Sequence, residues 1–134
     1  MATVRFERRI AAPVDTVWSI FCDPASIVTW FPGVTAANVN GNERVITLRS
    51  GIQMPEEILT VDPLIHRFQY RITSPLYRMH LGTIDAIGLD TDDTLCVYST
   101  TAEPHVMALV IGGGTYGALK EIERLALERH AKGH

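Results

Sequence analysis

The sequence predicts an α+β domain in which an antiparallel sheet of six or seven strands curves around one long C-terminal helix, while two short helices close one end. Three observations predict this fold. Apolar residues near the C-terminus recur every three or four positions, which is typical of an amphipathic helix. Before them, about six strand-like segments are joined by tight turns, which favours an antiparallel meander. The apolar face of such a sheet must be covered, and only this helix is long enough to do so.

Length and composition limit the class of protein. The 134 residues predict a single domain over 1–134, and 46% hydrophobic with 20% charged residues is ordinary globular composition. The net charge is −3 without a long basic run, so we expect no nucleic-acid partner. We expect no membrane insertion, because the least polar run, 104–119, is too short to span a bilayer. The charged N-terminus lacks a signal-peptide pattern, which predicts a cytoplasmic protein whose two cysteines are reduced.

The first elements are a strand and two short helices. Val4, Phe6 and Ile10 alternate with polar residues, which predicts a half-buried strand. Arg8 falls on the apolar side of this strand, where we expect it to lie near the strand end and reach water. The pattern then predicts helices over 13–22 and 25–30, separated by an Asp-Pro pair and ended by Phe-Pro-Gly.

From Val34 onward the pattern changes to strands joined by turns. The Asn40-Gly41 pair indicates a hairpin, because asparagine and glycine tolerate the positive φ that a two-residue turn requires. After the strand that begins at Val34, we expect further strands over 44–49, 54–61, 66–73, 77–89 and 94–102.

The last element is predicted to be a helix from Pro104 to Lys132. Its apolar stripe consists of Met107, Ile111, Gly114, Ala118, Ile122 and Leu125. Three consecutive glycines, 112–114, interrupt the stripe, and each is about 1 kcal/mol less favourable than alanine inside a helix. We expect them to kink or loosen the helix and to leave space beneath it.

Several stretches resemble the START-like (SRPBCC) helix-grip superfamily, particularly its polyketide cyclase/dehydrase branch. They are IAAPVDTVW at 10–18, Asp23-Pro24, WFPGV at 30–34, Tyr70-Arg71, Thr94 with Tyr98, and LKEIERL at 119–125. The resemblance covers essentially the whole chain and implies the helix-grip fold. It implies the chemistry only coarsely, because the superfamily contains lipid carriers, hormone receptors and cyclases. The glycine triplet departs from the larger residues usual in the last helix.

We predict a cavity between the sheet and the C-terminal helix that binds or transports a small hydrophobic molecule. Its wall would come from the apolar stripe and from aromatic residues on elements that face the helix or close its end. A buried tyrosine needs a partner for its hydroxyl group, so tyrosines could also supply polar anchors. The predicted ligand-binding residues are Trp30, Phe31, Phe68, Tyr70, His80, Tyr98, Met107, Ile111, Gly114 and Tyr116. The alternative for the aromatic residues is plain core packing.

The alternative function is an enzyme of the polyketide cyclase, dehydratase or isomerase kind that uses the same cavity. Its predicted catalytic residues are His80 and Glu57. Adjacent strand residues point to opposite faces, so at most one of Glu56 and Glu57 faces inward, and the pattern leaves open which one. An inward glutamate would have a raised pKa and could act as a base. The competing interpretations are a histidine with an ordinary hydrogen-bond partner and a glutamate paired with Arg71 or Arg78.

Other chemistry finds no support in the pattern. The stretch 112–117 matches G-x-G-x-x-G, but only 17 residues follow it and they are helical, so the second strand of a dinucleotide site is missing. No H-E-x-x-H or C-x-x-C motif is present, and we expect neither a metal nor a cofactor. A third function class, an interaction domain with a filled core, is disfavoured by the glycines. The pattern leaves open whether the chain forms a homodimer.

Overall fold

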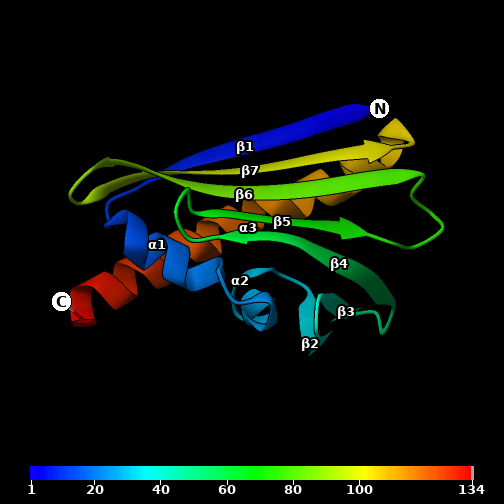
Figure 1. Cartoon of the computed structure of the whole chain (residues 1–134), viewed down its shortest axis with the longest axis horizontal. Coiled ribbons are helices and arrows are strands. Elements are labelled where there is room, and N and C mark those ends of the chain that lie inside the picture. The colour runs from blue at the N-terminus through cyan, green and yellow to red at the C-terminus, as the bar shows by residue number, and fades with distance from the viewer. Residues whose placement is uncertain (134) are drawn as a thin grey trace.

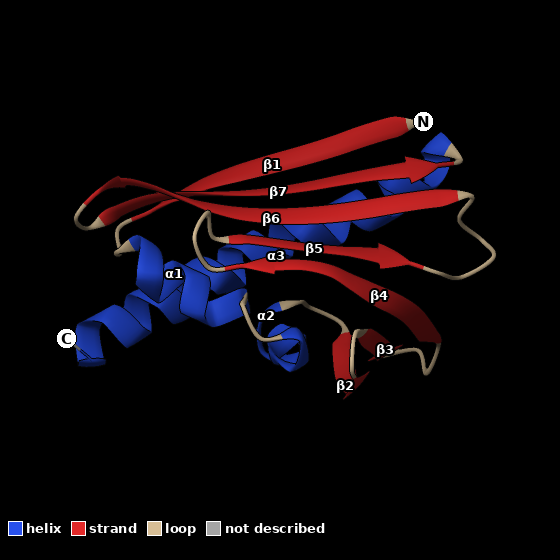
Figure 2. Cartoon of the chain, in the orientation of Figure 1, coloured by secondary structure: helices blue, strands red, loops and turns tan. Residues whose placement is uncertain are grey.

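A computed structural model describes residues 1–133 and confirms the predicted α+β fold. Seven antiparallel strands form one sheet in the order β1-β7-β6-β5-β4-β3-β2. The strands are β1 (Ala2–Ile10), β2 (Val34–Asn40), β3 (Glu43–Leu48), β4 (Gln53–Asp62), β5 (Arg67–Ile72), β6 (Met79–Asp90) and β7 (Asp93–Glu103). The helices are α1 (Val14–Phe21), a short 3-10 turn η1 (Pro24–Ser26), α2 (Ile27–Trp30) and α3 (His105–Gly133). Figure 1 and Figure 2 show the long helix α3 lying along one face of the sheet.

The helix α3 covers only part of the sheet closely. It packs mainly against β1 and β7, which form one side of the sheet, and against α1 and α2. The opposite side, formed by β2, β3 and β4, curves away at the lower right of Figure 1. Alternate residues of the strands turn inward, so the core contains residues such as Phe68, Ile84 and Tyr98. The backbone of α3 therefore lies close to β1 and β7 and farther from β3, β4 and β5.

The short connections follow the sequence pattern. Gly41 has φ +62°, as the Asn40-Gly41 hairpin between β2 and β3 requires. Arg8 lies near the end of β1 and is partly exposed, as expected, and its side chain turns toward α3. Its Nε donates a hydrogen bond to Oε1 of Glu123 at 2.6 Å, and both side chains are partly exposed. An ion pair between Arg8 and Glu123 thus joins β1 to α3 on the apolar side of the strand.

The glycine triplet does not interrupt α3, which is helical from His105 to Gly133. The expected loosening is absent, and two of the three glycines lie where another element approaches. A Cβ on Gly112 would lie 2.7 Å from Cγ1 of Val4, and a Cβ on Gly114 would lie 2.9 Å from Cζ of Phe31. A Cβ on Gly113 would meet nothing within 4 Å. Close packing of β1 and the α2–β2 loop therefore accounts for Gly112 and Gly114, but not for Gly113.

We predict opposite effects when neighbouring glycines are replaced by alanine. Gly113→Ala should raise the free energy of unfolding by up to about 1 kcal/mol, because alanine favours the helix and meets open space. Gly112→Ala should lower it by about 1–3 kcal/mol, because both Val4 Cγ1 and Val4 Cβ are too close for a methyl group. Urea denaturation of the two variants measures the difference. Equal shifts of the same sign would contradict the close packing of α3 on β1.

Candidate functional site

A cavity of about 350 Å³ lies between α3 and the β3–β5 part of the sheet. Its lining residues are Ile27, Phe31, Ile46, Leu48, Ile52, Met54, Glu56, Tyr70, Ile72, Leu76, Tyr77, Met107, Val110, Ile111 and Gly114. One of these residues, Glu56, is charged, and the tyrosines add hydroxyl groups. The volume and the apolar wall with a few polar groups are typical of a site for a small molecule.

The mouth of the cavity is formed by exposed apolar side chains from three elements. Ile52 in the turn before β4 is 59% exposed, Leu76 in the β5–β6 loop is 64% exposed, and Val110 on α3 is 66% exposed. All three also line the cavity. An apolar ligand that enters here would pass between two loops and the first turns of α3.

A buried ion pair lies at the polar end of the cavity. Arg44 on β3 and Glu56 on β4 are opposite each other in the strand register. Nε of Arg44 donates to Oε1 of Glu56 at 2.7 Å, and the two side chains are only 1% and 2% exposed. Nη1 of Arg44 donates to the carbonyl of Pro24 at 2.9 Å, whereas Nη2 has no hydrogen-bond partner among residues 1–133. A buried Nη2 without a partner marks a place where a ligand oxygen or a water would be stabilised.

Burial and the charge of Arg44 shift the pKa of Glu56 in opposite directions. Burial raises the pKa of this carboxyl group above its ordinary value, and the Arg44 guanidinium partly offsets the rise. The guanidinium also lies over the rings of Phe68 and Tyr70, at 5.6 and 5.1 Å from their centroids. Glu56 is therefore a carboxyl group in an apolar wall, fixed in place by one arginine.

Two tyrosine hydroxyls meet behind the cavity wall. The hydroxyl oxygens of Tyr70 on β5 and Tyr98 on β7 are 2.5 Å apart, and both residues are buried. Burial raises the pKa of both phenols, so both are neutral at neutral pH. The ring of Tyr70 lies on β6 at Gly82, where a Cβ would approach Tyr70 Cε1 to 2.6 Å. The missing side chain at Gly82 is what allows Tyr70 to reach Tyr98.

His80 lies in the core beside the cavity. Its Nδ1 accepts a hydrogen bond from the backbone N–H of Ile72 at 2.9 Å, so the neutral ring carries its proton on Nε2. That buried Nε2 has no partner in the part of the chain that the structure describes. The rings of Tyr70 and Tyr77 lie 5.5 Å from the imidazole, and burial lowers the pKa of His80 to about 4. His80 is thus a neutral histidine that does not line the cavity.

We predict that His80 makes the protein sensitive to acid. The unfolded chain binds the histidine proton at a pKa of about 6.5 and the folded chain only at about 4, so the folded state loses stability as pH falls between these values. The loss attributable to His80 should reach about 3 kcal/mol at pH 4. In His80→Asn, the amide oxygen can accept from Ile72 without titrating. Urea denaturation at several pH values should show a shallower acid loss for this variant, and parallel curves would contradict the prediction.

The structure brings half of the predicted ligand-binding residues to the cavity wall. Phe31, Tyr70, Met107, Ile111 and Gly114 line it. Trp30, Phe68 and Tyr98 are buried in the adjoining core, and His80 lies behind Tyr70 and Tyr77. These four residues shape the cavity from behind without lining it.

Tyr116 and Glu57 lie away from the cavity. Tyr116 is 48% exposed and packs on Phe6 with ring centroids 5.4 Å apart. Glu57 accepts a hydrogen bond from Nε of Arg71 at 2.6 Å on the solvent-facing side of the sheet. The structure therefore does not bring Glu57 to His80 or to the cavity wall. Pairing with Arg71, considered above as the alternative, is what the geometry shows.

Sequence reasoning missed the polar pair at the end of the cavity. Met54, Glu56 and Ile58 share the parity that points inward, and this parity would have selected Glu56 over Glu57 had the register of β4 been known. Arg44 begins the strand predicted over 44–49, and nothing in the pattern indicates that it is buried. A cation in a strand carries no signal of burial until its partner across the sheet is identified.

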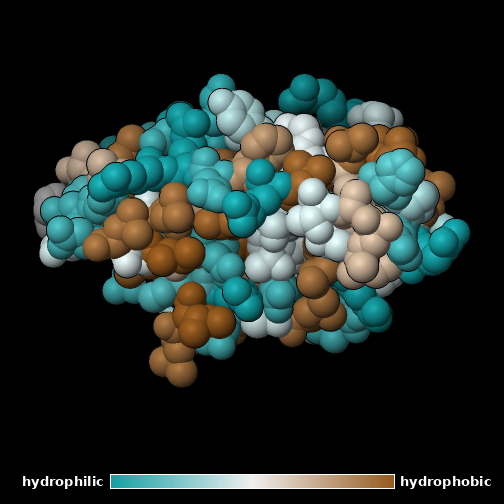
Figure 3. All heavy atoms as spheres, turned by 90° about the horizontal axis from the view of Figure 1, so that it is seen from above, coloured by the Kyte–Doolittle hydropathy of each residue, from teal (hydrophilic) through white to brown (hydrophobic). Residues whose placement is uncertain are grey.

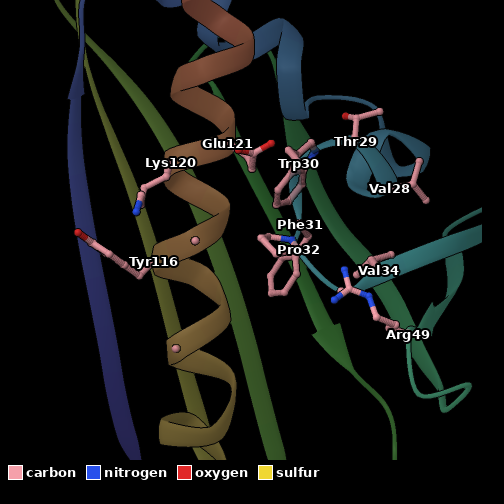
Figure 4. Close-up of a pocket in the computed structure, with 13 residues that line it drawn as sticks. Val28, Thr29, Trp30, Phe31, Pro32, Val34, Arg49, Tyr116, Lys120 and Glu121 are labelled. Carbon is pink, nitrogen blue, oxygen red and sulfur yellow. The ribbon is translucent and has the colours of Figure 1, made fainter.

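A second hollow lies outside the cavity, between α3 and the loop after α2. It encloses about 640 Å³ and is wider and more polar than the inner cavity. Figure 4 shows Phe31 and Pro32 turned toward α3, with Arg49 at one side of the hollow. Phe31 lines both spaces and packs against Gly114, so its ring separates them.

The described residues contain no group of three or more His, Cys, Asp and Glu side chains placed to hold a metal ion. No helix between residues 1 and 133 has the length and the apolar character needed to cross a membrane.

A curved sheet that wraps a long helix over an apolar cavity places the protein in the START-like helix-grip class. The chain belongs to the polyketide cyclase/dehydrase and lipid transport family, whose model matches residues 1–124. No curated protein matches the chain significantly.

Solved structures with low sequence identity share the fold. The protein XoxI from Bacillus cereus superposes with a TM-score of 0.88 at 20% identity, with 100% of both chains covered. Norcoclaurine synthase from Thalictrum flavum gives 0.77 at 19% identity, covering 95% of this chain and 87% of that one. The ZhuI aromatase/cyclase from Streptomyces sp. R1128 gives 0.77 at 19% identity, covering 98% and 96%. These similarities show the fold alone.

Proposed function

We propose that the protein binds or carries a small hydrophobic molecule in the cavity between the sheet and α3. The observation that carries the proposal is the cavity itself, which has an apolar wall, a polar end at Glu56 and an apolar mouth. A core that served only stability would be filled, because an empty volume of this size forfeits contacts on all its walls. The family, which includes lipid transport, supports the same function.

The polar end defines what the ligand should carry. Glu56 can accept a hydrogen bond, and the hydroxyl group of Tyr77, which also lines the cavity, can donate or accept one. A ligand with one hydroxyl or carbonyl group on an otherwise apolar body fits this arrangement. A fully polar molecule does not, because the remaining wall would leave its groups without partners.

Native mass spectrometry of the protein purified from its own host tests this function. We expect a retained molecule that is released by organic solvent and that identifies its class by mass. Protein stripped of it should bind it again at one equivalent. An unliganded protein that also fails to take up neutral apolar molecules would overturn the proposal.

A second candidate function is catalysis of a cyclase, dehydratase or isomerase reaction in the same cavity. The observation that favours it is Glu56, a carboxyl group with a raised pKa in the cavity wall, which is the environment of a general acid or base. Two structural neighbours are named as a synthase and an aromatase/cyclase. In this function Glu56 takes the role first assigned to Glu57, and His80 contributes only by supporting Tyr70 and Tyr77.

Deuterium exchange distinguishes the two functions. A medium-chain methyl ketone in D2O should exchange protons next to its carbonyl faster with the wild type than with Glu56→Gln, if the carboxylate removes those protons. NMR measures the rate, and binding of the same ketone to both proteins provides the control. Equal rates with intact binding would leave the carrier function and exclude Glu56 as a base for this class of substrate.

A further inference from the structure

Five exposed apolar residues surround the mouth of the cavity and form what we call the mouth patch. They are Ile52, Leu76, Val106, Leu109 and Val110. Val106 and Leu109 are 51% and 65% exposed, although neither lines the cavity. Large apolar side chains that gather at one place and remain this exposed indicate an interaction site.

The mouth patch is continuous across three elements. Val106 is three and four residues before Leu109 and Val110, so these side chains share one face of α3. Ile52 and Leu76 reach the same mouth from two loops, because both line one cavity with Val110. Figure 3 shows brown, apolar side chains at the right-hand end of the molecule, the end where α3 begins in Figure 1.

The charges near the mouth patch are positive, in contrast to the net charge of −3 of the whole chain. Arg49, in the same turn as Ile52, lines the adjoining hollow that Phe31 separates from the cavity, and Arg78 lies two residues after Leu76. Both arginines are exposed. Neither side chain forms an ion pair with residues 1–133. Glu103, a carboxylate of the same end of the sheet, is paired with the amino group of Met1 at 3.3 Å. The two loops that carry Ile52 and Leu76 therefore expose one arginine each.

We propose that the mouth patch docks the protein onto a lipid bilayer with anionic headgroups. Apolar side chains at the tip of a helix and of two loops can enter the headgroup region, while Arg49 and Arg78 contact lipid phosphates. Docking would place the cavity mouth against the acyl chains, so a hydrophobic ligand could transfer without crossing water. The inference rests on the proposed function, since contact between mouth and bilayer matters only when the cavity receives a ligand.

The two arginines favour a bilayer over a second copy of this chain. A symmetric dimer through the mouth patch would place the arginines of one copy near those of the other, whereas anionic lipid neutralises them. A dimer would also close both cavity mouths. A bilayer with anionic lipid can contact the apolar residues of the mouth patch, the two arginines and the cavity mouth at the same time.

Flotation with vesicles tests the docking. Wild-type protein is mixed with vesicles of phosphatidylcholine alone or with a quarter of phosphatidylglycerol, and the bound fraction is measured. We expect binding to the anionic vesicles, weakened about tenfold in Val106→Gln/Leu109→Gln. Arg49→Gln/Arg78→Gln should weaken it severalfold and reduce its salt dependence. Leu64→Gln, at an 89% exposed leucine in the β4–β5 turn, is the matched control and should bind as the wild type does.

Two further measurements separate the possible failures. Val106→Gln/Leu109→Gln should retain the thermal stability of the wild type and its binding of a neutral apolar dye, because neither residue lines the cavity. Dye binding without vesicle binding by the wild type would overturn the docking and leave the proposed function intact. A dimer in sedimentation velocity that Val106→Gln/Leu109→Gln abolishes would assign the patch to a second copy and overturn the docking. If Leu64→Gln lost as much vesicle binding as Val106→Gln/Leu109→Gln, that result would also overturn the docking.

Discussion

Replacing Arg44 by methionine should lower the free energy of unfolding by about 3–5 kcal/mol at pH 7. The change leaves the carboxylate of Glu56 buried without its 2.7 Å partner, in a side chain that is 2% exposed. The loss should shrink as pH falls. Without Arg44 the folded-state pKa of Glu56 rises further above its unfolded value, so protonation stabilises the folded variant at lower pH. Urea denaturation at pH 7 and pH 5 measures both effects.

Two controls show whether the loss comes from the uncompensated charge. Arg44→Met/Glu56→Leu should recover most of the stability, because an apolar pair of similar volume needs no hydrogen-bond partner. Arg71→Met breaks the exposed pair with Glu57 and should change stability by no more than about 1 kcal/mol, since the arginine is 54% exposed. A double variant as unstable as Arg44→Met would contradict this explanation.

Gly82→Ala should lower the free energy of unfolding by about 3 kcal/mol, the upper end of the range for overpacking. The new methyl group would lie 2.6 Å from both Cε1 and Cζ of Tyr70, which must leave its place on β6. Its hydroxyl then loses the 2.5 Å contact with Tyr98, and a buried phenol oxygen is left without a partner. Thermal and urea denaturation measure the stability, and tyrosine absorbance reports the change around the rings.

Two variants identify Tyr70 as the cause. Gly88→Ala on the same strand is the matched control, because its methyl group would meet Val14 at an ordinary 3.4 Å, and it should be close to neutral. Gly82→Ala/Tyr70→Leu removes the aromatic ring from the collision. It should be more stable than the sum of the two single effects predicts. Additive effects would mean that the methyl group strains the strand itself.

Periodicity and turn residues were sufficient for the fold. The alternation in β7 and the Asn40-Gly41 turn are local features that the sheet needs in any context. The apolar stripe on α3 identified the face that packs on the sheet, because a helix with one apolar face buries that face. The glycine triplet predicted space beneath α3, but Val4 and Phe31 fill the volume beside Gly112 and Gly114, and of the three glycines only Gly114 lines the cavity.

The residues of the site were harder to predict for a physical reason. Whether Glu56 or Glu57 faces inward depends on the register of β4 with its neighbours, and adjacent carboxylates look alike in the sequence. Tyr116 belongs to α3, yet its position on the helix turns it toward Phe6 at the sheet edge. Distances between strands decide which aromatic residues line a cavity and which pack behind it. The spacing of residues along one strand gives no information about those distances.

The proposed function requires that a hydrophobic ligand occupies the cavity between the sheet and α3. Titration of the wild type, Ile111→Phe and Leu109→Phe with the neutral dye N-phenylnaphthylamine tests it most directly. Ile111 lines the cavity and Leu109, two residues earlier on α3, does not. We predict that filling the cavity in Ile111→Phe weakens dye binding about tenfold, while Leu109→Phe binds as the wild type does. Wild-type affinity in Ile111→Phe, or equal weakening in both variants, would contradict the claim.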